Sequence, residues 1–104
     1  MSELADRQML LLSLQRALLG EVPASLRQAS IEADPVLQIV RLRFESAELD
    51  EEGQEGCSCA ATGVIADFPA TWTLDEQHVV VPVPAALAPL ANVAYRRAEP
   101  VDAG

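Results

Sequence analysis

The sequence contains no lysine, so all seven of its basic residues are arginines. Acidic residues number 16, and the formal net charge is −9 at pH 7. An acidic chain repels the phosphates of nucleic acids and the anionic headgroups of membranes, so we predict neither as a partner. The same charge attracts and steers a basic protein, which is the predicted partner if the acidity serves binding. Acidity that serves solubility alone remains the competing interpretation.

Cysteine and histidine are scarce, with two cysteines and one histidine in the chain. A structural zinc site needs three or four ligands around one point, so we predict no metal and no other cofactor. In a helix, Cys57 and Cys59 would point about 160° away from each other. We therefore expect Cys57 in the core and Cys59 at the surface. A thiol or metal function through this pair stays open only if the local helix is absent.

Catalytic and nucleotide-binding motifs are also missing. His78 has Asp75 and Glu76 close by in sequence but no nucleophile motif, so we interpret it as a surface histidine on a strand. The spacing of the glycines matches neither type of phosphate-binding loop. We predict that the chain is not an enzyme.

Long apolar runs are absent as well. The run over residues 9–12 follows Glu3 and Asp6, where a secretion signal would carry positive charge. No stretch is long enough to cross a bilayer, and a cytoplasmic location is the resulting expectation. A length of 104 residues with 50% hydrophobic content suits one domain, predicted over residues 1–97 with a frayed tail over 98–104.

Apolar periodicity predicts two helices. Over residues 3–19, leucines recur at helical spacing and Gly20 then ends the helix. Over residues 50–67, a second apolar stripe follows an N-cap at Asp50. Three glycines argue against this second helix, because each costs about 1 kcal/mol relative to alanine.

Strands are predicted where apolar and polar residues alternate. The predicted strand ranges are 26–33, 36–45, 70–74, 78–83 and 93–97. The first two form a hairpin with one buried face, and residues 75–77 form a turn. The order is helix, hairpin, helix and then two or three strands. This αββαββ order predicts a single α+β domain with its helices on one face of a mainly antiparallel sheet.

Six of the acidic residues gather within eleven positions. They are Glu45, Glu48, Asp50, Glu51, Glu52 and Glu55. Their spacing does not match that of a calcium-binding loop. A solvated helix start is one interpretation, and a docking patch for a basic protein is the other. We take the six as the candidate partner-binding residues.

Four short stretches resemble a group of small, uncharacterised bacterial proteins. They are residues 16–23 (Arg-Ala-Leu-Leu-Gly-Glu-Val-Pro), 64–69 (Val-Ile-Ala-Asp-Phe-Pro), 93–97 (Val-Ala-Tyr-Arg-Arg) and 42–44 (Leu-Arg-Phe). The resemblance spans most of residues 10–97. Some proteins of this group are associated with toxin immunity, so the resemblance implies an immunity-like or inhibitor-like protein. Its motifs carry no catalytic group.

The leading prediction is therefore a non-enzymatic domain that docks a basic protein through the acidic cluster. A self-associating structural domain, in the form of a homodimer, is the first alternative. It is favoured by the wide apolar surface of the first predicted helix and by the apolar residues 79–81. The thiol or metal function at Cys57 and Cys59 is the second alternative.

Overall fold

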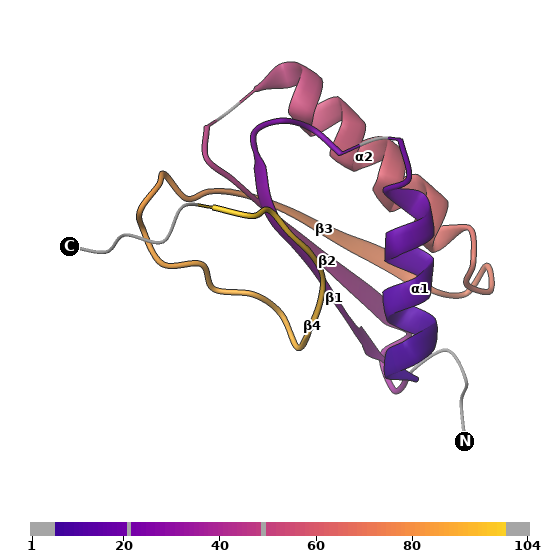
Figure 1. Ribbon diagram of the computed structural model, residues 1–104. Coiled ribbons are helices and arrows are strands. Elements are labelled where there is room, and N and C mark those ends of the chain that lie inside the picture. Colours follow the sequence, from indigo (N-terminus) through magenta and orange to yellow (C-terminus); the bar gives the residue numbers. More distant parts are fainter. Residues whose placement is uncertain (1–5, 21, 49, 100–104) are drawn as a thin grey trace.

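The computed structural model describes residues 6–20, 22–48 and 50–99. Within these ranges, two helices and four strands follow one another in the predicted order. They are α1 (Arg7–Ala17), β1 (Leu26–Asp34), β2 (Ile39–Ser46), α2 (Glu51–Ile65), β3 (Thr73–Val80) and β4 (Asn92–Arg96). Both helices lie on one face of a single sheet (Figure 1). None of the described helices has the length and apolar character needed to cross a membrane.

The four strands form a mixed sheet in the order β3-β2-β1-β4. β1 pairs antiparallel with β2 and with β4, whereas β2 pairs parallel with β3. The α+β class is thus confirmed, with one parallel pairing added to the antiparallel ones. The parallel pair needs a crossover connection, and α2 supplies it. β3 and β4 lie at opposite edges, so residues 81–91, here called the crossing segment, must pass over the outer face of the sheet.

The helix-facing side of the sheet is apolar. Ala29 and Ile31 of β1 lie opposite Phe44 and Leu42 of β2, and all four are buried. The helices add the buried side chains Leu10, Leu14, Leu18, Cys57, Ala60, Ala61 and Val64. Burial of each large apolar side chain contributes about 1.5–3 kcal/mol, so this layer supplies most of the stability.

The first helix is shorter than predicted. Asp6 has an extended backbone (φ −65°, ψ 128°), and its side chain accepts a hydrogen bond from the Gln8 backbone N–H at 2.9 Å. Asp6 is therefore the N-cap and not a member of the first turn, so the prediction of a helix running through this residue is wrong. The predicted start at residue 3 lies outside the described residues. Gly20 has a φ of +77° just beyond the helix, in agreement with the predicted stop.

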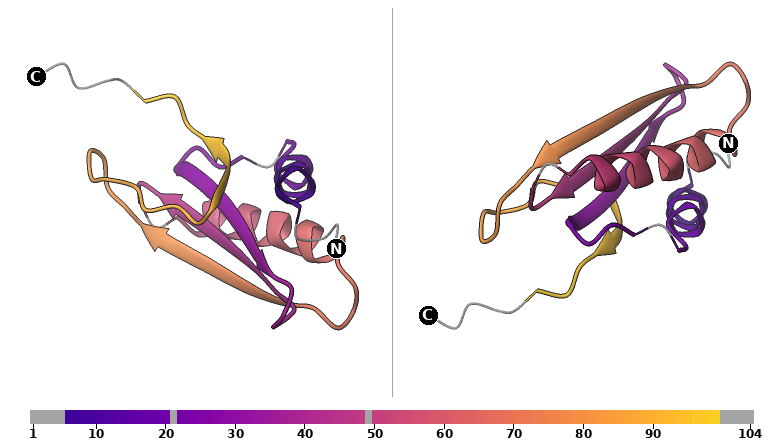
Figure 2. Two further views of the ribbon diagram at one scale, coloured as in Figure 1. Left: turned by 90° about the horizontal axis from the view of Figure 1, so that it is seen from below. Right: turned by 90° about the horizontal axis from the view of Figure 1, so that it is seen from above.

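The second helix is confirmed, and two of its three glycines are points of close approach. A Cβ atom at Gly53 would lie 2.8 Å from Ser25 Oγ. A Cβ atom at Gly63 would lie 3.3 Å from the Cβ of Ala17 in α1. The glycines therefore let α2 rest directly on the segment before β1 and on α1. Figure 2 shows these two helices beside each other, with α1 nearly end-on and α2 lengthwise.

The turn predicted at residues 75–77 is wrong, because β3 is one uninterrupted strand. It pairs with β2 over its whole length. Its polar residues have partners on β2: Asp75 lies 3.6 Å from the Arg41 guanidinium, and Gln77 accepts a hydrogen bond from Arg43 Nε at 2.9 Å. These cross-strand partners stabilise residues 75–77 in a strand, although the same residues are typical of a turn when the sequence is considered alone.

The outer face of the sheet is also partly buried, so the prediction of a hairpin with one buried face is wrong. The crossing segment covers this face and binds to it. Ser30 Oγ accepts a hydrogen bond from the Leu90 N–H at 2.9 Å, and the Glu45 carboxylate accepts one from the Ala88 N–H at 2.6 Å. Gln28 Nε2 donates to Glu45 at 3.1 Å. The buried side chains of Gln28, Ser30 and Glu45 are therefore polar, and each of them is hydrogen-bonded.

Arg27 ties the crossing segment to the end of the described chain. Its guanidinium donates to the carbonyls of Val81 and Ala85, each at 2.9 Å, and to both carboxylate oxygens of Glu99 at 2.8 Å. The hydrogen bond from Arg27 is the largest cause that lowers the pKa of Glu99, to about 2. Glu99 belongs to the tail predicted over 98–104, yet it is firmly bound; residues 100–104 lie outside the described residues.

Candidate partner-binding site

The structure separates Glu45 from the other acids of the predicted cluster. Its side chain is only 1% exposed, and its carboxylate is occupied by Gln28 and by the backbone N–H of Ala88. The strand alternation of β2 points Glu45 to the outer face, where the crossing segment covers it. A partner cannot reach this carboxylate, so Glu45 is removed from the candidate site.

The remaining five acids lie together at the start of α2. They are Glu48, Asp50, Glu51, Glu52 and Glu55, and we call them the acidic surface. Asp50 caps the helix by accepting a hydrogen bond from the Glu52 N–H at 3.1 Å. Glu51 and Glu52 occupy the first turn, where the helix dipole stabilises negative charge. Capping and the helix dipole therefore give Asp50, Glu51 and Glu52 a structural role. Glu55 lies beyond the first turn and has neither role.

No ion pair neutralises the acidic surface within the part of the chain that the structure describes. Four arginines form ion pairs, and their partners are all other acids: Arg16–Asp67, Arg27–Glu99, Arg41–Glu32, Arg41–Asp75 and Arg97–Glu99. Five carboxylates within eight residues repel one another. A basic partner would remove that repulsion.

Two shallow hollows flank the first turns of α2. One, of about 280 Å³, lies between α2 and residues 22–24 and includes Asp50 and Glu52. The other, of about 340 Å³, is lined by Glu52, Glu55, Gly56 and Cys59. Gly56 borders both hollows and has no side chain to fill them. Side chains of a partner can therefore reach between the carboxylates.

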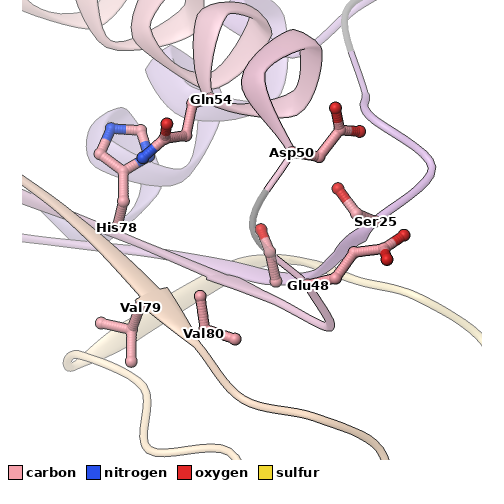
Figure 3. A pocket seen from close by; sticks show the side chains of 8 residues that line it. Ser25, Glu48, Asp50, Gln54, His78, Val79 and Val80 are labelled. Carbon is pink, nitrogen blue, oxygen red and sulfur yellow. The ribbon is translucent and has the colours of Figure 1, made fainter.

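A third, smaller recess lies between the first turn of α2 and the end of β3 (Figure 3). Its lining residues are Ser25, Ser46, Glu48, Asp50, Gln54, His78, Val79 and Val80, and its volume is about 20 Å³. Ser25 is only 6% exposed, and its hydroxyl has no hydrogen-bond partner among the described residues. A buried polar group without a partner costs about 1–3 kcal/mol. This recess was not foreseen from the sequence.

His78 does not form a catalytic arrangement with its neighbours. Its ring stacks on Phe44 with the centroids 5.4 Å apart, and its Nε2 contacts Glu76 Oε2. Ser58 donates to the same Glu76 oxygen at 2.6 Å. The carboxylate thus lies between the serine and the histidine, whereas a nucleophile needs its base in direct contact. The group holds α2 against β3.

The two cysteines point apart, as predicted. Cys57 is buried and Cys59 is exposed, and neither forms a disulfide. Burial raises the pKa of the Cys57 thiol to about 12, so this thiol stays protonated and unreactive. In residues 6–20, 22–48 and 50–99, no group of three or more His, Cys, Asp or Glu side chains is arranged to hold a metal ion.

The fold and the site together define the class of protein: a small α+β domain that presents an acidic surface without ion pairs among the described residues at the start of one helix. A comparison with known protein families then gives the family. The model described as MafI2 immunity protein matches residues 7–99. The chain therefore belongs to the MafI2 immunity protein family, and the resemblance to toxin-immunity proteins is confirmed. No curated protein matches the chain.

Proposed function

We propose that this chain is an immunity protein that neutralises a toxin by binding it through the acidic surface. Family membership supports the immunity role. The observation that carries the assignment of the surface is that its five carboxylates have no ion pair among the described residues, whereas four arginines pair with other acids. The toxin presents a basic surface, and the chain acts by occupying it and not by catalysis. The predicted cytoplasmic location is part of the proposal.

Electrostatics sets the expected character of this binding. Complementary charge steers two proteins together and raises the association rate. Salt screens exposed charges, and the screening length falls to about 3 Å at 1 M salt. Association with the toxin should therefore be fast at low salt and much slower at high salt.

The first experiment identifies the toxin and tests protection. Tagged chain captures proteins from host-cell lysate at low and high salt, and each captured protein is then expressed alone. The cognate toxin is the one that arrests growth alone and permits growth when this chain is co-expressed. A chain that captures no growth-arresting protein would contradict the immunity role.

The second experiment tests the surface. Glu51→Gln/Glu52→Gln/Glu55→Gln removes three negative charges from the acidic surface. Gln8→Lys/Ala70→Lys/Ala86→Lys adds three positive charges at exposed positions elsewhere and reaches the same net charge of −6, from −9 + 3. We expect the first variant to lose about 10–100-fold in affinity and the second less than about threefold. Equal losses would show that only net charge matters and would refute the surface.

Self-association is a second candidate, favoured by exposed apolar side chains. Leu12 and Leu19 are 56% and 76% exposed, and Val79 and Val80 are exposed at the end of β3. A homodimer would cover such side chains. Sedimentation equilibrium that shows only monomer at high protein concentration would refute this candidate.

A further inference from the structure

The small recess beside the acidic surface combines the apolar side chains of Val79 and Val80 with six polar residues, two of which are carboxylates. In Figure 3, the hydroxyl of Ser25 points toward the first turn of α2, where Asp50 lies. Glu48 lies on the rim, and Gln54 and His78 border the opposite side. The recess thus joins residues from the segment before β1, the end of β2, α2 and β3.

Two oxygen atoms of residues that line this recess accept no hydrogen bond from the described residues. Ser25 Oγ is buried and has no partner among the residues the structure describes. Asp50 uses Oδ1 to cap the Glu52 N–H, which leaves its Oδ2. A Cβ atom at Gly53 would lie 2.8 Å from Ser25 Oγ and 3.5 Å from Asp50 Oδ2, so these two oxygens lie near each other, beside a glycine that lines the neighbouring hollow.

The size of the recess limits what can enter it. Its volume of about 20 Å³ holds one water-sized group, because a single water needs roughly 10–15 Å³ of such space. A lysine ammonium is a compact charge with three N–H donors, whereas an arginine guanidinium is a larger, planar group with five. The recess therefore suits an ammonium group and not a guanidinium.

The charge of the recess selects a cation. A helix N-terminus ordinarily favours an anion. Here, however, Asp50 already occupies the Glu52 N–H, and Glu48 and Asp50 place two carboxylates on the recess. We propose that the recess receives the ammonium group of a lysine side chain of the toxin, with Ser25 and Asp50 as hydrogen-bond acceptors. This assignment rests on the proposed function and names one contact within it.

The unpartnered hydroxyl distinguishes a binding role from a structural one. If Ser25 served the fold alone, alanine would do as well or better, because a buried hydroxyl without a partner is unfavourable. Ser25→Ala should therefore leave the unfolding midpoint unchanged or raise it while weakening the binding of ammonium. If the Ser25 hydroxyl instead supported folding, its removal would lower both the unfolding midpoint and the binding of ammonium.

The free chain allows a direct test with small cations. Methylammonium chloride is titrated into ¹⁵N-labelled protein. Tetramethylammonium chloride, whose cation carries no N–H donor, is titrated separately as the comparison. We expect saturable amide shifts at Ser25, Asp50 and Gln54 with methylammonium alone. These shifts should be lost in Ser25→Ala and kept in Asp67→Asn, a control that removes one negative charge beyond the C-terminal end of α2, outside both the recess and the acidic surface. Equal shifts with both cations, or none with either, would show that the recess holds only water and would overturn the proposal.

The toxin complex gives an independent test. Ser25→Ala and Glu48→Gln should each weaken toxin binding about tenfold. Reductive dimethylation of the toxin's lysines keeps their charge but leaves one N–H on each, so it should weaken binding to the wild-type chain more than to Ser25→Ala. If the triple glutamine variant weakens binding but Ser25→Ala does not, the lysine contact is wrong and the proposed function stands. If neither variant weakens binding, the acidic surface fails as well.

Discussion

The crossing-segment region and the start of α2 both contain acidic residues, but their carboxylates differ in whether they have partners within the chain. Under the crossing segment, Glu45 and Glu99 are largely or fully buried, and each carboxylate has hydrogen-bond donors within the chain. At the start of α2, four of the five acids of the acidic surface are exposed, and none of the five has an ion pair among the described residues. The contrast indicates that the first group stabilises the fold and the second is available to a partner.

Ser25 is the exception that sharpens this contrast. Buried polar groups are ordinarily hydrogen-bonded, and those under the crossing segment follow that rule. Ser25 is buried but unpartnered among the described residues, and it lies at the acidic surface. Unsatisfied groups that persist in a fold tend to mark functional positions. The departure therefore falls in the region assigned to binding.

The largest expected effect comes from exchanging one acid in each region for alanine. Glu45→Ala leaves Gln28 Nε2 and the Ala88 N–H without their acceptor and should lower the free energy of unfolding by about 2–3 kcal/mol. Glu48→Ala, three residues away at the surface, should change it by less than about 0.5 kcal/mol. Urea unfolding at pH 7 measures both values. Similar losses in the two variants would break the comparison between the regions.

Local sequence signals predicted the order of the elements. Asp50 as a cap, Gly20 as a stop and the apolar stripes of the two helices all act within a few residues, so they are visible in the sequence. The continuous strand over residues 73–80 was not predicted, because its polar residues are stabilised by Arg41 and Arg43, more than 30 positions earlier. Parallel pairing depends on a distant strand in the same way.

The candidate site was partly predictable for the same reason. Clustering of acids is a local signal, and five of the six acids named from it lie together at the start of α2. Glu45 was included wrongly, because its burial depends on a segment more than 40 residues later in the chain. Ser25 was missed because no local pattern marks it; its hydroxyl lies close to Gly53, which is distant in the sequence.

A smaller effect is expected from Gly53→Ala, which tests the packing of the acidic surface. The new Cβ would lie 2.8 Å from Ser25 Oγ, and the resulting overpacking should lower the free energy of unfolding by about 1–2 kcal/mol. In a Ser25→Ala background the obstructing oxygen is gone, and the helix propensity of alanine then adds up to about 1 kcal/mol. The double variant should therefore be as stable as Ser25→Ala or more so. Additive losses in this double-mutant cycle would contradict the close approach.

The smallest expected effect is the loss of stability at low pH that comes from Glu99 in the crossing-segment region, because Glu99 retains some exposure. Its pKa is lowered from an ordinary value of 4.5 to about 2, so between these values the unfolded chain binds more protons at this group than the folded chain. The stability contributed by Glu99 is therefore fully present above about pH 4.5 and is lost as the pH falls toward 2. In Glu99→Gln, the unfolding midpoint should decline less steeply over this window than in the wild type. Glu55→Gln removes the same charge from the acidic surface and should keep the wild-type decline; a flattened decline in both would show that the pairing of Glu99 with Arg27 does not set the difference.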